Sequence, residues 1–365
     1  MRPRLLLTAV SVLVLAGGCS GDDTTGAADA PPPDWPASIV LGVVPGPGQS
    51  DLPSSLAPML ESIESRLGIG VGLVEVADHP TLVDDIRGGR VDVGVVDPFE
   101  YTSARDEDDD IVAVSQLARF GAFTRHGQWF TNDPAVCAEP PVEGTALVNG
   151  PGGVTQVSAL ETDAQQVGVV FGADGPEFSA TTADGSAISP GRSCIGDLAE
   201  VPGSTVAFIT PGSLAGGVFP SLQIARLGVD PRTAIDLTYA ESHHESVRAV
   251  YDGTVRFGVA FDDARRRIAD EHPDVGERVI VFNVTDEIPH EAIVTSRGFP
   301  ELLAASVQDA IAAYLETGAG ATLVDRALGW TDIRSAVESD FDVVREASTV
   351  PMSDEVTTTT SPGSP

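Results

Sequence analysis

The sequence predicts an α/β protein with two lobes, each built on a mixed, mostly parallel sheet. Two stretches alternate strand, helix, strand, helix and strand, at residues 39–96 and 205–261. Repeats of this length place their strands in parallel with right-handed crossovers. The chain that remains after an N-terminal apolar segment is also long enough for two substantial cores.

In the first unit, apolar periodicity predicts a helix over residues 52–67, with Ser50 or Asp51 as its N-cap. Asp78 is expected to cap the second, shorter helix of this unit. The last strand leads into the segment DPFEY. The strands are expected at residues 39–44, 71–76 and 91–96.

In the second unit, the strand at residues 205–210 runs into a turn of small residues, PGSLAGG. The following strands, at 235–239 and 255–261, end close to Ser242-His243 and Asp262-Asp263. Ligands of such sheets bind at the carboxyl ends of the strands, where helix N-termini point. We therefore expect Ser213, His243 and Asp263 to converge on one crevice.

Outside the two units the periodicity is less regular. Residues 138–193 are rich in Gly, Pro, Thr and Ser, with short strand-like runs such as 167–171, and indicate an inserted β-hairpin or a long loop. Further strands are expected at residues 111–118, 279–283 and 292–295, and helices at 302–315 and 320–328.

The N-terminus has the features of an export signal. Two arginines precede an apolar run that is too short to span a membrane, and Ala16-Gly17-Gly18-Cys19 follows. This segment resembles a bacterial lipoprotein lipobox, which implies cleavage before Cys19 and a diacylglycerol on its sulfur. The alternative is a plain signal peptide with an incidental cysteine. Residues 20–36 are expected to form a flexible tether, and 351–365 a disordered tail.

Composition excludes several classes of function. The net charge of −33 would repel nucleic acid, so no nucleic-acid partner is expected. The 21 basic residues are all arginine, which excludes a P-loop lysine and a Schiff-base lysine. The sequence also has no GxSxG or HExxH motif. We therefore expect neither an enzyme nor a cofactor.

Three cysteines allow one intramolecular disulfide if Cys19 carries a lipid. An even remainder in an exported protein favours a bond between Cys137 and Cys194. The alternative is two separate buried thiols.

Several segments, in this order, resemble the phosphate/phosphite/phosphonate substrate-binding proteins of ABC transporters, which have a type II periplasmic binding fold. The segments are GGRVDVGVVDPFEY, TVAFITPGSLAGGVFPSLQIARLGVDP, SHHESVRAVYDGTVRFGVAFDDA and IPHEAIV. The resemblance implies a lipid-anchored extracytoplasmic receptor, on the outer face of the cytoplasmic membrane, that delivers a small oxyanion or zwitterion to a permease. A monomer is expected.

The same resemblance implies how the chain divides. Lobe 1 would comprise residues 37–122 and 289–350, and lobe 2 residues 123–288. Two crossing strands, near 119–130 and 284–292, would act as the hinge on which the lobes close over the ligand.

The resemblance also implies a set of ligand-binding residues. Ser213 matches the first hydroxyl of the family's anion turn, but Leu214 and Ala215 stand where Thr and Ser are usual. His243 matches a histidine that contacts the anion. The remaining positions correspond to acidic partners of amine-bearing phosphonates (Asp263 and Glu291), an aromatic residue of the first lobe (His79) and the region of the hinge aromatic (Gln128 and Trp129).

Two other functions remain open from the sequence. The first is a metal-binding lipoprotein, because imidazole and carboxylate groups are ligands of first-row metals. The second is a ligand-binding sensor or partner protein without a role in transport. In the first alternative, the metal site would be formed by His79, His243, His290, Asp263 and Glu291.

Overall fold

The computed structural model describes residues 31–46, 49–150, 152–158, 182, 184–261 and 263–351. The expected signal segment with Cys19, most of the tether, the tail after Pro351 and the strand-like run 167–171 lie outside the described residues. None of the helices within the described ranges has the length and apolarity needed to cross a membrane.

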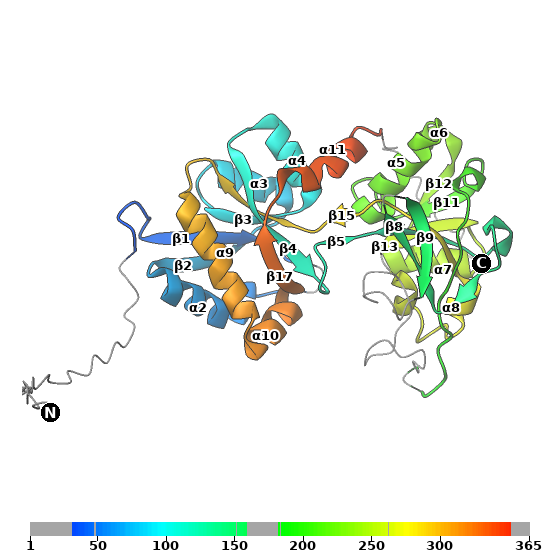
Figure 1. Ribbon diagram of the computed structural model, residues 1–365, viewed down its shortest axis with the longest axis horizontal. Coiled ribbons are helices and arrows are strands. Elements are labelled where there is room, and N and C mark those ends of the chain that lie inside the picture. The colour runs from blue at the N-terminus through cyan, green and yellow to red at the C-terminus, as the bar shows by residue number, and fades with distance from the viewer. Residues whose placement is uncertain are drawn as a thin grey trace, which may run out of the picture.

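The first lobe is built on a six-stranded sheet with the order β17-β4-β16-β3-β1-β2 (Figure 1). β1 pairs in parallel with β2 and β3, as the βαβαβ pattern predicts, whereas β16 is antiparallel to β3 and β4. The mixed character of the sheet is therefore confirmed. Its strands are β1 (Ser38–Val43), β2 (Gly70–Glu75), β3 (Val93–Val96), β4 (Ile111–Arg119), β16 (Ala292–Ser296) and β17 (Trp330–Ser335).

Helices cover both faces of this sheet. One apolar cluster joins it to α1, α2, α9 and α10, and a second joins it to α3 and α4. These helices are α1 (Leu52–Ser55), α2 (Ala57–Leu67), α3 (His79–Arg87), α4 (Pro98–Glu107), α9 (Glu301–Leu315) and α10 (Gly318–Leu328).

The prediction of one helix over residues 52–67 is wrong. The chain forms two helices that meet at Leu56, because Pro58 has no N–H to donate to the carbonyl four residues earlier. Asp51 precedes α1 in a left-handed conformation, with φ of 55°, and its side chain does not cap the helix. Asp78 does cap α3, accepting a hydrogen bond from the Thr81 N–H at 2.8 Å.

The second lobe contains a seven-stranded sheet with the order β12-β11-β13-β6-β14-β10-β7. β11 is parallel to β12 and β13, again as predicted, and β6 runs antiparallel between β13 and β14. The strands are β6 (Gly127–Thr131), β7 (Val142–Glu143), β10 (Arg192–Ser193), β11 (Thr205–Phe208), β12 (Asp236–Tyr239), β13 (Phe257–Phe261) and β14 (Ile280–Val284).

A π-helical turn comes after β11 and continues directly into α5. The helical elements of this lobe are the π-turn η4 (Leu214–Val218), α5 (Phe219–Arg226), α6 (Pro231–Ala234), α7 (His243–Tyr251), α8 (Val275–Arg278), and the 3-10 turns η1 (Pro134–Val136), η3 (Leu198–Glu200) and η5 (Ala264–Arg267).

The predicted disulfide is present. Cys137 and Cys194 are bonded with their Cα atoms 5.6 Å apart, at the two ends of the predicted insertion. The described part of the insertion contains a hairpin of β8 (Thr145–Gly150) and β9 (Gly153–Ser158). Gln156 Nε2 donates to the Ser193 carbonyl at 2.7 Å and holds this hairpin against lobe 2.

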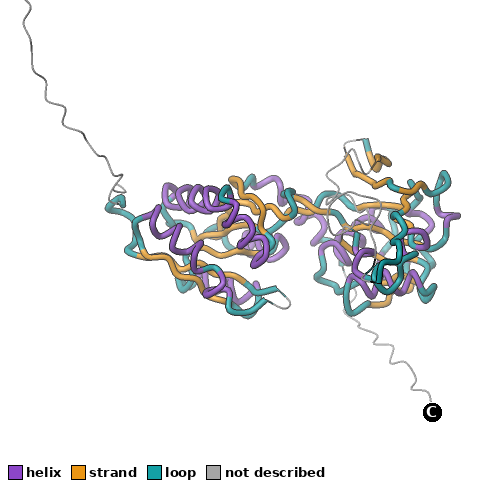
Figure 2. Tube along the Cα trace, turned by 90° about the horizontal axis from the view of Figure 1, so that it is seen from below, coloured by secondary structure: helices purple, strands orange, loops and turns teal. Residues whose placement is uncertain are grey.

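Two short strands connect the lobes, β5 (Thr124–Arg125) and β15 (Ile288–Pro289), and they pair antiparallel. Figure 2 shows the narrow region that they form between the lobes. The C-terminal helix α11 (Asp342–Ser348), preceded by the 3-10 turn η6 (Glu338–Phe341), packs against both α4 and α5. The two-lobed fold with two hinge strands is therefore confirmed, and α11 is an additional bridge that the sequence did not predict.

Candidate functional site

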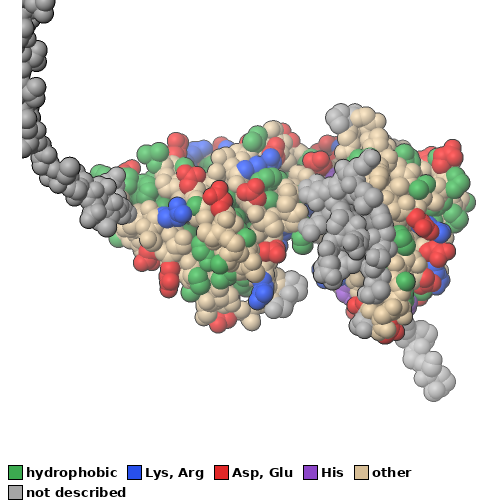
Figure 3. All heavy atoms as spheres, turned by 60° about the horizontal axis from the view of Figure 1, so that its bottom comes forward, with side chains coloured by type: hydrophobic (Ala, Val, Ile, Leu, Met, Phe, Trp, Pro, Cys, Tyr) green, Lys and Arg blue, Asp and Glu red, His purple; other side chains and the backbone are tan. Residues whose placement is uncertain are grey.

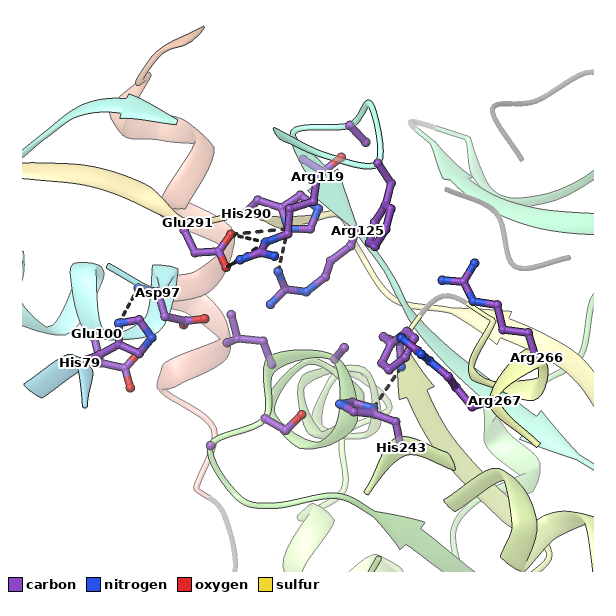
Figure 4. A pocket seen from close by; sticks show the side chains of 18 residues that line it. His79, Asp97, Glu100, Arg119, Arg125, His243, Arg266, Arg267, His290 and Glu291 are labelled. Atoms are coloured by element: carbon purple, nitrogen blue, oxygen red, sulfur yellow. Dashed lines mark hydrogen bonds and ion pairs between the residues drawn. The ribbon is translucent and has the colours of Figure 1, made fainter. Parts of the chain in front are cut away.

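A cavity of about 570 Å³ lies between the two lobes, where the surface narrows in Figure 3. Residues from both lobes and from the hinge line it. Four of them are arginines, three are histidines and three are acidic (Figure 4). The charged and histidine side chains are Arg119, Arg125, Arg266, Arg267, His79, His243, His290, Asp97, Glu100 and Glu291.

The turn after β11 reaches this cavity. Ser213 is the N-cap, and its hydroxyl accepts a hydrogen bond from the Gly216 N–H at 3.1 Å, which leaves the hydroxyl proton available to a ligand. The N–H groups of Leu214 and Ala215 belong to the first helical turn, where no intrahelical acceptor exists. Gly127 allows this turn to pack closely, since a Cβ there would lie 2.5 Å from the Ala215 carbonyl oxygen. The turn thus offers donors to an anion.

His243 is the first residue of α7 and lines the cavity close to this turn. Its Nδ1 accepts a hydrogen bond from the Phe261 N–H at 3.2 Å. Burial, followed by the charge of Arg125, lowers the pKa of His243 to about 4, so the ring is neutral at pH 7. With Nδ1 used as an acceptor, the proton is on Nε2, which can donate to a ligand oxygen.

His79 occupies the corresponding place in lobe 1. It is the first residue of α3, and its Nδ1 accepts from the Asp97 N–H at 3.4 Å. The same tautomer argument makes Nε2 of this ring a donor as well. The cavity therefore receives one imidazole from each lobe.

Glu291 lines the cavity but its carboxylate is already paired. Arg119 binds it with two nitrogens, with Nε 2.9 Å from Oε2 and Nη2 2.6 Å from Oε1. Burial alone would raise the pKa of Glu291, but the Arg119 guanidinium outweighs burial and lowers this pKa to about 2. The expected role of Glu291 as partner of a ligand amine is thus replaced by an internal ion pair.

Arg125 and His290 form a second contact at the hinge. Arg125 Nη1 lies 2.9 Å from His290 Nδ1. Burial, followed by the charge of Arg125, lowers the pKa of His290 to about 3. His290 is therefore neutral, and its Nδ1 is the acceptor for the guanidinium.

The acidic groups lie on the lobe 1 side, at the start of α4. Asp97 caps this helix by accepting from the Phe99 N–H at 2.9 Å, and Glu100 lies in the first turn. Burial and the adjacent Asp97 carboxylate raise the pKa of Glu100 to about 7. Because these acids occupy the helix N-terminus, this side favours a neutral or cationic part of a ligand.

Three of the predicted residues lie outside the cavity. Asp263 is 2% exposed and forms a buried ion pair with Arg265, with Oδ1 2.8 Å from Nε. Gln128 is also buried, and its Oε1 accepts from the Asp263 N–H at 3.1 Å. Trp129 packs within the lobe 2 core and donates its indole N–H to Gln223. These side chains stabilise the lobe rather than reach the cleft.

The residues of the metal hypothesis do not form a metal-binding cluster, although His79, His243, His290 and Glu291 all line the cavity. Among the described residues, no group of three or more His, Cys, Asp or Glu side chains has an arrangement that could hold a metal ion. The Nδ1 atoms of His79, His243 and His290 are each used by a different partner, and Asp263 is buried elsewhere. Several arginines between them would also repel a cation.

The sequence reasoning missed the arginines that line the cavity. The run Arg265-Arg266-Arg267 begins four residues after the end of a predicted strand, and such a run is a signal in so acidic a chain. Arg119 and Arg125 lie within the predicted first hinge crossing, near residues 119–130, but nothing in their spacing distinguished them from surface arginines.

A family model described as the periplasmic substrate-binding protein of phosphonate ABC transporters matches residues 41–138 and 150–341. The chain belongs to this family. It is also similar to the phosphate-import protein PhnD of Mycolicibacterium smegmatis, with 24% identity over 266 residues. That match covers 71% of this chain and 65%, slightly less than two thirds, of the length of the relative.

Solved structures of low sequence identity share the fold of this protein. XAC2383 from Xanthomonas citri bound to chloride superimposes with a TM-score of 0.53 at 14% identity, covering 86% of this chain and 96% of that chain. PhnD1 from Prochlorococcus marinus in complex with methylphosphonate gives a TM-score of 0.51 at 12% identity, covering 86% and 97%.

Proposed function

We propose that this protein is the extracytoplasmic solute-binding receptor of an ABC importer and that it binds a phosphorus oxyanion between its lobes. The ligand class is phosphate, phosphite or a phosphonate. The single observation that carries the proposal is the interlobe cavity, which combines the donors of the Ser213 turn with four arginines and the Nε2–H of His243. Helix N-termini and guanidinium groups are the usual protein ligands of such oxyanions.

The cavity is polarised, which narrows the ligand class further. His243, Arg266 and Arg267 lie on the lobe 2 side, and Asp97 and Glu100 on the lobe 1 side (Figure 4). The oxyanion would bind to lobe 2, and the rest of the solute would face lobe 1. This arrangement suits a phosphonate with a neutral or amine-bearing substituent, that is, a small anion or zwitterion.

The proposal includes attachment to the membrane through a lipid on Cys19 and closure of the lobes about the β5 and β15 strands. Closure would exclude water from the cavity and so strengthen its charge contacts. The lobe boundaries would be those expected from the sequence, with residues 37–122 and 289–350 closing onto 123–288. Fractionation of cells expressing the Cys19→Ser variant tests the anchor, since this variant should leave the membrane fraction.

The experiment that tests ligand binding is thermal unfolding of the purified protein with a panel of solutes. The panel holds phosphate, phosphite, methylphosphonate, 2-aminoethylphosphonate, sulfonates, zinc and manganese. A ligand that binds only the folded state adds about 2.7 kcal/mol at a hundred times its dissociation constant. We expect a rise with a phosphorus oxyanion, and His243→Ala should abolish most of it.

A rise with metal ions alone would overturn the proposal and favour the metal-binding alternative. No rise with any solute would show that the cavity does not bind this class of ligand.

A further inference from the structure

Two arginines of the cavity have charges that the described part of the chain does not neutralise. Arg266 is half-buried and Arg267 is exposed, and both line the cavity from the turn η5. Neither makes an ion pair with a described carboxylate, whereas Arg119 and Arg265 both do. In a chain with 54 acidic residues, this pair of guanidinium groups is an unusual local concentration of positive charge.

A buried network fixes the turn that carries them. Asp263 has a left-handed backbone with φ of 30°, and its N–H donates to Gln128 Oε1. The Arg265 side chain points inward, where its Nη1 donates to the carbonyls of Arg192 and Val279 at 2.9 and 2.8 Å. Since the guanidinium of Arg265 binds Asp263 on its other side, the direction of the next two residues is set by the core of lobe 2.

The turn after β11, which we call the anion turn (Ser213, Leu214 and Ala215), has only the Ser213 hydroxyl as a side-chain donor. Leu214 and Ala215 are each 4% exposed and contribute only backbone N–H groups. The protein as a whole carries a net charge of −33, which repels any anion. Compensation must therefore come from charged groups within reach of the turn, and Arg266 and Arg267 lie on the same side of the cavity as His243 (Figure 4).

We propose that Arg266 and Arg267 are specificity-determining residues that make the cavity select dianionic ligands over monoanionic ligands of the same shape. This inference rests on the proposed function. The hydrogen-bond donors of the turn would contact a phosphonate and a sulfonate in the same geometry, because the two groups have the same shape. The two guanidinium groups instead interact in proportion to ligand charge, so a doubly charged phosphonate gains about twice what a singly charged sulfonate gains.

The test uses methylphosphonate and methanesulfonate, which have the same shape but carry two charges and one charge when the phosphonate is fully ionised. Isothermal titration calorimetry at such a pH would compare the wild-type protein with the Arg266→Gln/Arg267→Gln double variant. We expect an affinity loss of about 100-fold for methylphosphonate and about tenfold for methanesulfonate, so the preference falls about tenfold.

The matched control is Arg66→Gln/Arg232→Gln. It makes the same change in net charge at two exposed arginines outside the cavity and should leave both affinities within about twofold. A loss of methylphosphonate affinity in the cavity variant no larger than in the control overturns the inference while the proposed function stands. If the wild-type protein binds neither ligand nor phosphate, the proposed function fails and the inference fails with it.

Discussion

His79 in lobe 1 and His243 in lobe 2 occupy equivalent places. Each is the first residue of a helix whose N-cap accepts a hydrogen bond from the N–H three residues on. Each ring accepts, through Nδ1, the N–H of the residue 18 positions further along the chain, at the end of the following strand. The same strand–helix–strand unit therefore delivers one imidazole donor to the cavity from each side.

The residues that come after this strand differ between the lobes. In lobe 1, Asp97 and Glu100 come next and place negative charge beside the histidine, whereas in lobe 2 the turn continues to Arg266 and Arg267. Each lobe also contains an arginine that is ion-paired with a carboxylate. In lobe 1 this is Arg119, which lines the cavity, and in lobe 2 it is Arg265, which is fully buried. Similar scaffolds thus carry side chains of opposite charge, which matches the polarised ligand that we propose.

The largest expected effect is a loss of stability when one of the two ion pairs is broken. Asp263→Asn removes the carboxylate that pairs with the buried Arg265 guanidinium and should lower the free energy of unfolding by about 3–5 kcal/mol. Glu291→Gln should cost less, about 2 kcal/mol, because the Arg119 and Glu291 side chains are 29% and 16% exposed. Denaturant unfolding at pH 7 measures both, and Asp230→Asn, at an exposed pair with Arg232, is the control with little effect. Equal losses for all three would contradict the burial argument.

Lowering the pH should have opposite effects on stability through the histidines and through Glu100. His243 and His290 have pKa values lowered from 6.5 to about 4 and 3, so the unfolded state binds more protons below about pH 6.5 and their contribution to stability is lost as pH falls toward 4. Glu100, with its pKa raised from 4.5 to about 7, contributes stability that is lost as pH rises through 7.

The measurement is unfolding free energy between pH 4.5 and 8. Replacing both histidines by Gln should reduce the acid-induced loss between pH 7 and 5 by about 4 kcal/mol, half of it from each ring, whereas Glu100→Gln should reduce the loss between pH 5 and 8. Identical pH profiles of the wild type and variants would show that these groups titrate normally.

The third prediction compares the two histidines in binding. His243→Ala should weaken methylphosphonate binding by at least tenfold, since it removes a neutral donor beside the anion turn. His79→Ala should change it by about threefold or less, because the anion would lie on the lobe 2 side. His244→Ala, at an exposed neighbour that does not line the cavity, is the control. A larger effect at His79 would reverse the proposed orientation of the ligand.

The smallest effect concerns Glu100. As pH rises through about 7, Glu100 gains a negative charge on the lobe 1 side, so it should weaken anion binding by about threefold. The measurement is the pH dependence of methylphosphonate affinity in the wild type and in Glu100→Gln. Titration of the ligand affects both proteins equally and cancels in the ratio of the two affinities. If the two curves are parallel, Glu100 does not sense the ligand.

Much of the fold could be predicted from local patterns. The strand orders β2-β1-β3 and β12-β11-β13 are those of βαβαβ repeats, and the hinge strands and the disulfide also lie where they were expected. The break between α1 and α2 follows from Pro58, a local signal that the apolar periodicity does not contain. The role of α11 as a bridge could not be predicted, because it depends on which surfaces of α4 and α5 lie close together.

The candidate site was only partly predictable. Strand ends and helix N-termini correctly predicted Ser213 and His243 at one cavity, and the family resemblance predicted His79 there. Asp263 failed because its direction depends on a left-handed backbone and on Arg265, two residues away. Glu291 reached the cavity, but pairing with Arg119 across 172 positions removed its expected role.

The sequence by itself determined the alternation of strands and helices, the acidic surface and the presence of histidines at two helix starts, because these depend on periodicity, composition and neighbouring residues. Only the tertiary structure decided which charges are neutralised and which face the cavity. Three consecutive arginines are chemically identical in the sequence. Arg265 points into the core and Arg266 and Arg267 line the cleft, because a buried carboxylate and two backbone carbonyls accept the hydrogen bonds of Arg265.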